Sequence, residues 1–112
     1  MRIYKVFRAA EQAQFEASGE TEGAPIDLVD GYIHFSTAEQ LAETLAKHFS
    51  GELDLVLLAV EADGLREDLR WEPSRGGALF PHLYRALHRG DIAAKWDLTV
   101  GADGLHQLPE GL

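Results

Sequence analysis

Histidine and serine side chains lie two positions apart at His34 and Ser36, in a segment that begins as a strand and ends as a helix. Period-two alternation places Tyr32, His34 and Ser36 on one face of a strand over 32–36, and Ile33 and Phe35 on the other. We expect the apolar pair to face the core and the polar face to line a cleft or meet solvent. His34 and Ser36 could then touch one ligand; the alternative for His34 is a half-buried strand histidine.

The residues after His34 carry two overlapping helix-capping patterns, Ser36 with Glu39 and Thr37 with Gln40. They predict a helix that begins at Thr37 and runs to about residue 49. Free backbone N–H groups and the dipole at such a helix start would form an anion site beside His34. The alternative is that Ser36 serves mainly as a helix cap.

A second group with chemical potential is Trp71–Glu72, followed by the glycine-containing loop 73–77. Glu72 could act as a general base or steady a cation, and Trp71 could stack on an aromatic ring. Strand alternation makes the two side chains face opposite ways unless the strand ends there. The alternative places Trp71 in the core and pairs Glu72 with an arginine at a strand end.

The third group is the segment Phe80-Pro-His-Leu-Tyr84, which brings His82 among aromatic residues. It is either a rigid wall of a binding site or a satellite hydrophobic cluster. His34, Glu72 and His82 would supply two histidines and one carboxylate, but no close metal-ligand spacing supports a metal site, so none is predicted. The chain also has no nucleophile elbow, P-loop or dinucleotide-binding glycine motif.

Short elements of alternating type must position these groups. We expect strands at 3–7, 32–36, 53–60, 69–72 and 92–100, and helices at 9–17 and 37–49. Loops are expected at 20–30, with a short turn at 26–29, and at 73–77. Because strands outnumber helices and helical crossovers are missing after the strand at 53–60, the pattern favours an α+β fold with a curved, mostly antiparallel sheet and two main helices. Residues 1–112 form one domain with a core over about 2–100 and a frayed tail at 101–112.

Composition narrows the range of partners. The 112 residues carry a formal net charge of −9 and no cysteine. The charge disfavours long nucleic acids and membranes as partners, and the absence of thiols fits a cytoplasmic protein. The longest apolar run, 55–60, is too short to span a bilayer. Most of the net charge lies in residues 1–64, so the arginines of the second half are the expected anchors for any anionic ligand.

Five segments together resemble the bacterial family called domain of unknown function 952: Ile3–Tyr4, DGYIHFSTAEQL at 30–41, DLVLL at 54–58, LRWE at 69–72 and FPHLY at 80–84. The resemblance covers roughly residues 2–100. Members of this family are similar in fold to ADP-ribosyltransferases, and this similarity implies a split, curved antiparallel sheet whose cleft holds NAD. Many members carry histidine where this chain has Lys5, which puts the role of that position in question.

The resemblance makes a cytoplasmic enzyme or binding domain for NAD or an ADP-ribose derivative the leading prediction, with cleavage or transfer at the ribosyl C–N bond. His34, Glu72 and His82 would be catalytic. The predicted ligand-binding residues are Tyr4, Lys5, Tyr32, Ser36, Thr37, Trp71, Arg75, Tyr84 and Arg85. The alternatives are a non-catalytic module for a metabolite or protein, and a metal-dependent hydrolase that uses the three catalytic residues. The sequence makes no prediction of the substrate acceptor or the oligomeric state.

Overall fold

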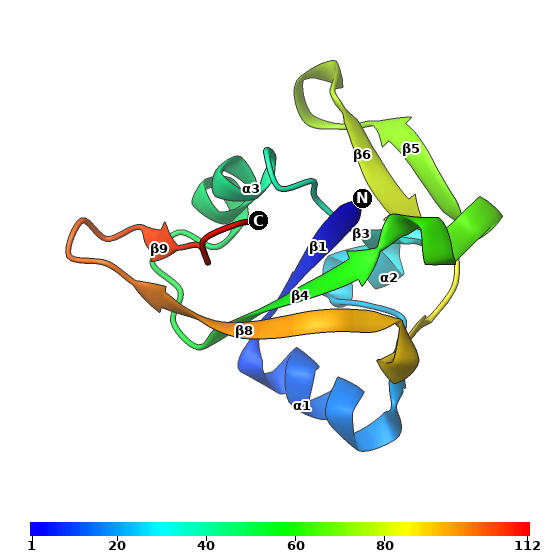
Figure 1. Cartoon of the computed structure of the whole chain (residues 1–112), viewed down its shortest axis with the longest axis horizontal. Coiled ribbons are helices and arrows are strands. Elements are labelled where there is room, and N and C mark those ends of the chain that lie inside the picture. Colours follow the sequence, from blue (N-terminus) through cyan, green and yellow to red (C-terminus); the bar gives the residue numbers. More distant parts are fainter.

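The fold is a curled antiparallel sheet with helices on both sides, seen in a computed structural model that describes residues 1–74 and 76–112 (Figure 1). The strands are β1 (Arg2–Phe7), β2 (Glu20–Thr21), β3 (Ile33–His34), β4 (Leu55–Glu61), β5 (Leu69–Pro73), β6 (Leu79–Leu83), β7 (Leu87–His88), β8 (Ile92–Val100) and β9 (His106–Gln107). The helices are α1 (Ala9–Ser18), α2 (Pro25–Asp30) and α3 (Leu41–His48), with 3₁₀ turns η1 (Ala62–Asp68) and η3 (Arg89–Asp91). This arrangement confirms the predicted α+β class and its curved antiparallel sheet.

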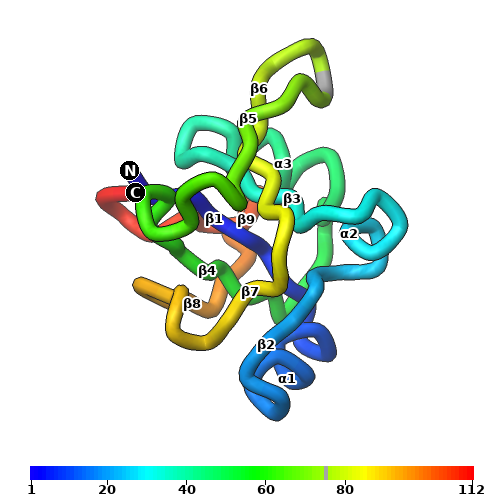
Figure 2. Tube along the Cα trace, turned by 90° about the vertical axis from the view of Figure 1, so that its right-hand side faces the viewer, coloured from blue at the N-terminus to red at the C-terminus, as the bar shows by residue number. Residues whose placement is uncertain are grey.

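Two sheets meet at a single point. One has the strand order β1-β4-β8-β9 and the other β3-β6-β5, and each pairing between strands is antiparallel. They join at a bridge in which Tyr4 N donates to Ser36 O at 2.8 Å and Ser36 N donates to Tyr4 O at 2.9 Å. Past that bridge, toward the end of β1, the structure described gives no further β1–β3 pairing, so the curled sheet is split there. The β5–β6 hairpin projects at the far edge (Figure 2).

β4 holds the molecule together because both of its faces are buried. Alternate residues of its near-continuous apolar run join two separate hydrophobic clusters, Val56, Leu58 and Val60 in one and Leu55, Leu57 and Ala59 in the other. Figure 1 shows α1 and α3 on opposite sides of this strand, where each covers one cluster. The prediction of a strand covered on both faces is confirmed.

The predicted start of the second main helix is wrong. α3 begins at Leu41, and the residues before it form a separate turn. Thr37 N donates to Gln40 Oε1 at 3.0 Å and Gln40 N donates to Thr37 Oγ1 at 3.2 Å, so the Thr37–Gln40 pair does form the reciprocal bonds of a capping box. These bonds close the turn and leave the helix to start beyond it, on the buried residues Leu41 and Leu45.

Two further segments differ from the predictions. In the predicted loop 20–30 the short turn expected at 26–29 is part of a helix, α2, which has Pro25 at its first turn and ends at Gly31 in the left-handed conformation with φ 85°. The tail that we expected to fray contains β9, which pairs with the end of β8. Leu108 and Leu112 then pack on the cluster that α3 covers, and their apolar burial holds the tail against the sheet.

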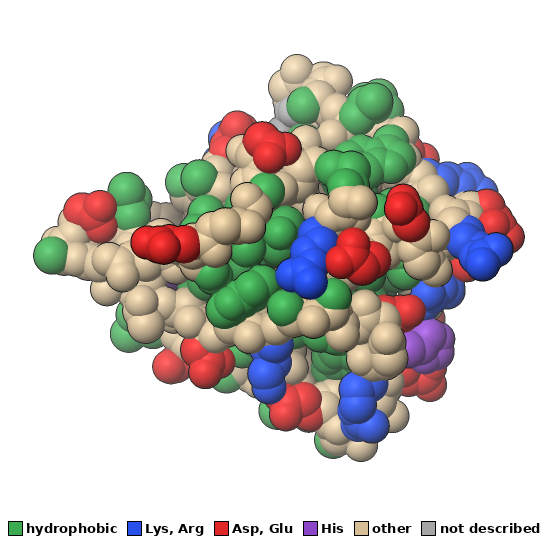
Figure 3. Space-filling view, viewed as in Figure 1, with side chains coloured by type: hydrophobic (Ala, Val, Ile, Leu, Met, Phe, Trp, Pro, Cys, Tyr) green, Lys and Arg blue, Asp and Glu red, His purple; other side chains and the backbone are tan. Residues whose placement is uncertain are grey.

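No helix in the described part of the chain is both long and apolar enough to cross a bilayer. Acidic and basic side chains are interspersed over the face shown in Figure 3. Exposed ion pairs such as Arg2–Glu61 at 2.9 Å and Lys95–Glu16 at 3.9 Å join some of them. Pairs of this kind contribute little to stability, because solvent screens both charges.

Candidate functional site

A cavity of about 570 Å³ lies where the sheet splits, between β1, α2, β3, α3 and β6. Its polar lining includes Lys5, Asp30, His34, Ser36 and His82. The alternation predicted for residues 32–36 is confirmed: Ile33 and Phe35 belong to the hydrophobic core, where Phe35 also borders the cavity, and His34 and Ser36 give the cavity polar groups. Two histidines separated by 48 positions in the chain therefore meet at one hollow, with ring centroids 5.3 Å apart.

His82 is the most deeply buried polar group of the cavity, with 2% of its surface exposed. Its Nδ1 lies 2.8 Å from Glu72 Oε1. An ionised carboxylate only accepts hydrogen bonds, so Nδ1 carries a proton. Nε2 is buried and has no hydrogen-bond partner among the described residues. Glu72 thus holds the ring in one orientation and leaves Nε2 without a partner.

Glu72 is itself held by a second donor. The Tyr84 hydroxyl donates to the same oxygen, Glu72 Oε1, at 2.6 Å. The hydrogen bond from Tyr84, and after it the one from His82, lowers the pKa of Glu72 below its ordinary value. The same contact with Glu72 raises the pKa of the Tyr84 phenol. Glu72 is therefore ionised at neutral pH and Tyr84 protonated, and both help to fix the orientation of His82.

His34 has a carboxylate on each side of its ring. Nδ1 lies 2.5 Å from Asp27 Oδ1 and Nε2 lies 2.9 Å from Asp30 Oδ2. The Tyr32 ring contacts both histidines, with its centroid 4.7 Å from that of His34 and 4.2 Å from that of His82. The two histidine rings and the Tyr32 ring are consequently packed against one another, and contacts on several sides fix the orientations of the histidines.

Asp27 is the hub beneath His34 and was not among the predicted site residues. It is 1% exposed and accepts hydrogen bonds from Lys5 Nζ at 2.7 Å, Ala24 N at 2.7 Å and the backbone N of His34 at 3.1 Å. Burial acts to raise the pKa of Asp27, but the hydrogen bond from His34 and the charge of Lys5 outweigh it, so the pKa lies below its ordinary value. Gly23 makes room for it, because a Cβ there would lie 2.3 Å from Asp27 Oδ2.

Lys5 supports this network from β1. Its Nζ donates to Asp27 Oδ2 and, at 3.0 Å, to the backbone oxygen of His34. Burial lowers the pKa of Lys5, while the charge and hydrogen bond of Asp27 act in the opposite direction. The Lys5 residue is 6% exposed, and its amine already donates to two acceptors. Its contacts fix the position of His34, so Lys5 has a structural role in the site.

The predicted anion site beside His34 is not formed. Ser36 Oγ lies 2.8 Å from Thr44 Oγ1 of α3 and does not cap a helix. Thr37 N donates to the Gln40 side chain, and the helix starts four residues later than predicted. Backbone N–H groups of a helix start are therefore not gathered next to His34. Tyr4 is buried and lines the cavity, and its backbone forms the bridge to Ser36.

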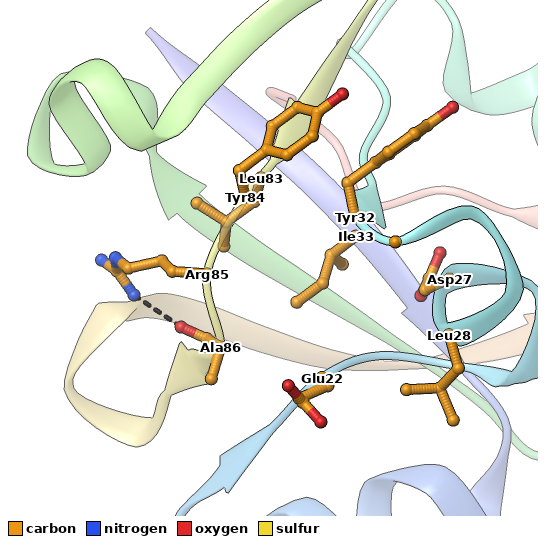
Figure 4. A pocket seen from close by; sticks show the side chains of 10 residues that line it. Glu22, Asp27, Leu28, Tyr32, Ile33, Leu83, Tyr84, Arg85 and Ala86 are labelled. Atoms are coloured by element: carbon orange, nitrogen blue, oxygen red, sulfur yellow. Dashed lines mark hydrogen bonds between the residues drawn. The ribbon is translucent and has the colours of Figure 1, made fainter.

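Trp71 and Arg85 lie away from this cavity. Trp71 is opposite Pro81 in the β5–β6 register and is 40% exposed, so the alternative that places it in the core is wrong. Arg85 donates to Asp91 at 2.9 and 3.1 Å and lines a smaller hollow of about 250 Å³ with Tyr32 and Tyr84 (Figure 4). The predicted Arg75 lies outside the described residues.

The three residues named for a metal site are not arranged as ligands around one point. Glu72 directs an oxygen to His82 Nδ1, and both ring nitrogens of His34 face other carboxylates. Over the described chain no group of three or more histidine, cysteine or acidic side chains is placed to hold a metal ion. The arrangement instead resembles a hydrogen-bonded acid–base system built on two imidazoles.

The fold and the cavity define a small α+β protein with a curled half-barrel sheet, and comparison identifies its family. The chain belongs to the family DUF952, a protein family of unknown function, whose model matches residues 6–95. This confirms the family resemblance, whereas the ADP-ribosylation-like assignment stays a prediction.

Solved structures of one relative support the fold. The chain is 52% identical to the crystal structure of protein CC0527 from Caulobacter crescentus, with a TM-score of 0.91 and coverage of 96% of this chain and 94% of that chain. The solution structure of CC0527 is also 52% identical, with a TM-score of 0.88 and coverage of 99% and 96%. No curated protein matches the chain.

Proposed function

We propose that the chain binds a small organic molecule in the cavity beside His82 and that the Glu72–His82 pair accepts a proton from it. The observation that carries this proposal is the buried Nε2 of His82, which has no hydrogen-bond partner among the described residues. Leaving such a group unpaired costs about 1–3 kcal/mol, which a ligand hydroxyl or amine would relieve. The cavity of about 570 Å³ falls within the range of roughly 300–1,000 Å³ usual for small-molecule sites.

The ligand class in this proposal is a nucleotide of the NAD or ADP-ribose type, with cleavage or transfer at the ribosyl C–N bond. A water molecule or an acceptor hydroxyl would give its proton to His82 as it attacks the ribosyl carbon. Lys5 and Arg8 line the cavity, but each already has a carboxylate partner, Asp27 at 2.7 Å and Glu52 at 2.7 Å. We therefore expect the ribosyl end of the ligand to lie beside His82 and the diphosphate to lie outside.

Titration of the ¹⁵N-labelled protein with NAD, ADP-ribose and, separately, nicotinamide riboside tests this proposal. Amide shifts should concentrate in β1, β3 and β6, and the Nε2 resonance of His82 should change because it gains a donor. Release of nicotinamide, followed by chromatography, reports turnover. Binding without turnover over many hours would favour the non-catalytic alternative over the enzyme.

The matched variants are His82→Gln and His88→Gln. His88 lies 3.7 Å from Glu20 in an exposed pair away from the cavity, so its replacement should leave binding unchanged. Glu72→Gln provides a second test at a half-exposed position, since it keeps an acceptor for His82 Nδ1 and removes the charge. Equal binding by all three variants, or no shifts at millimolar ligand, would contradict the proposal for this ligand class.

A further inference from the structure

The two histidines of the cavity have opposite hydrogen-bonding surroundings. His82 has a carboxylate on Nδ1 alone, whereas His34 has Asp27 on Nδ1 at 2.5 Å and Asp30 on Nε2 at 2.9 Å. A neutral imidazole has one donor and one acceptor nitrogen, while the doubly protonated ring has two donors. Carboxylates on both sides of His34 are satisfied together only by the ring that carries two protons.

The other groups around His34 fit this assignment. Lys5 of β1 donates to Asp27 and to the backbone oxygen of His34, so the buried amine neutralises the carboxylate that lies under the ring. Asp30 is the last residue of α2, and its side chain is 36% exposed. Tyr32 and His82 complete the surroundings through ring contacts with His34 at 4.7 and 5.3 Å. Asp27 is therefore fixed, while Asp30 is the partner that can move aside.

We propose that His34 is the proton donor of this site and His82 its proton acceptor, with Asp27 and Lys5 as positioning residues. The inference rests on the proposed function for the role of His82. Within the proposed ligand class it narrows the substrate to ADP-ribose-type N-glycosides whose leaving nitrogen must gain a proton while the nucleophile loses one, and it excludes NAD itself, because nicotinamide leaves as a neutral molecule without a proton. Pairs of groups with opposite protonation are the usual basis of such assignments.

The step balances with water as the second reactant. A water proton passes to His82 Nε2 as the water oxygen forms a bond to the substrate carbon. The bond from that carbon to the leaving nitrogen breaks, and its electron pair stays on the nitrogen, which takes the Nε2 proton of His34 after Asp30 moves aside. His82 then returns its proton to solvent and His34 regains one, so both rings recover their starting states.

The protonation of the four ring nitrogens of His34 and His82 can be measured directly by NMR, which tests the inference. A long-range ¹H–¹⁵N correlation spectrum of the ligand-free, tag-free chain at pH 7, assigned with His34→Gln and His82→Gln, distinguishes protonated from unprotonated nitrogens. We expect both nitrogens of His34 to be protonated and His82 to be protonated at Nδ1 alone. In Asp30→Asn the Nε2 resonance of His34 should shift toward the unprotonated range at the same pH, with the pattern of His82 unchanged.

Glu20→Gln, beside His88, is the matched control and should leave the spectrum of His34 unaltered. A wild-type His34 with one unprotonated nitrogen at pH 7, or no response of His34 to Asp30→Asn, would overturn the donor role and leave His82 as a base. A proton on His82 Nε2 would instead overturn the proposed function itself. The two failures are therefore distinguishable in one spectrum.

Discussion

Removal of the charge on Asp27 should destabilise the protein severely, because the buried Lys5 amine would lose the carboxylate that offsets the cost of burying it. In Asp27→Asn the Lys5 amine keeps the His34 backbone oxygen as an acceptor and loses the carboxylate at 2.7 Å. Breaking a buried ion pair from one side costs about 3–5 kcal/mol. In a domain of 112 residues each kcal/mol lowers the melting temperature by about 4 °C, so we expect a fall of roughly 12–20 °C.

The reverse substitution should cost less. In Lys5→Met the Asp27 carboxylate keeps Ala24 N, His34 N and the His34 ring as partners, so fewer contacts are lost than in Asp27→Asn. The double variant should be more stable than the sum of the two single effects predicts, since the lone charge disappears.

Urea unfolding at pH 7, with the slope checked for constancy, measures these free energies. Lys95→Met removes a surface lysine 3.9 Å from Glu16 and should change stability by no more than about 0.5 kcal/mol. If Asp27→Asn cost about 1 kcal/mol or less, or matched this control, the charged network under His34 would not have the structural role described.

Acid should unfold the protein through the carboxylates whose pKa is held low. The pKa values of Asp27, Glu72 and Asp91 lie below their ordinary values of 3.8, 4.5 and 3.8. The stabilisation from these ionised carboxylates is therefore complete above the ordinary values and is lost as pH falls through the lower folded-state values. Urea unfolding at stepwise lower pH should show this loss, and Asp27→Asn should make the free energy of unfolding depend less on pH. Gly23→Ala should lower the melting temperature strongly, because φ is 104° and the new Cβ would meet Asp27 Oδ2, whereas Gly90→Ala, with open space around it, should not. Tyr84→Phe should raise the pKa of Glu72, as followed by carboxyl ¹³C shifts, and an unchanged titration would refute the role given to the hydroxyl.

Strands and their faces were predictable because alternation of side chains depends only on local geometry. The burial of Ile33 and Phe35, with His34 between them facing the cavity, follows directly from period-two alternation. The burial of both faces of β4 follows from its near-continuous apolar run. The convergence of His34 and His82 was a hypothesis from family resemblance, since nothing local to either residue specifies the β3–β6 register that pairs them.

The parts that were missed depend on tertiary contacts. Asp27 and Asp30 lie in a segment without hydrophobic periodicity, and Asp27, on helix α2, becomes a buried hub only because Lys5 and His34 reach it from strands β1 and β3. The one local signal was Pro25 followed by an acidic residue, which is typical of a helix start. The capping pattern at Thr37 was real, but its bonds close a turn, and only the buried Leu41 and Leu45 decide where α3 begins.

Where the backbone ladder between β1 and β3 stops, a side chain takes its place. The amine of Lys5 reaches the main-chain oxygen of His34, across a gap that ordinary strand pairing no longer closes. The reach of that side chain therefore acts as a spacer: four methylene groups prop the two strands apart. A shorter hydrogen-bonding side chain at position 5 would either draw the two strands together and fill the cavity, or leave the backbone oxygen of His34 without its hydrogen bond.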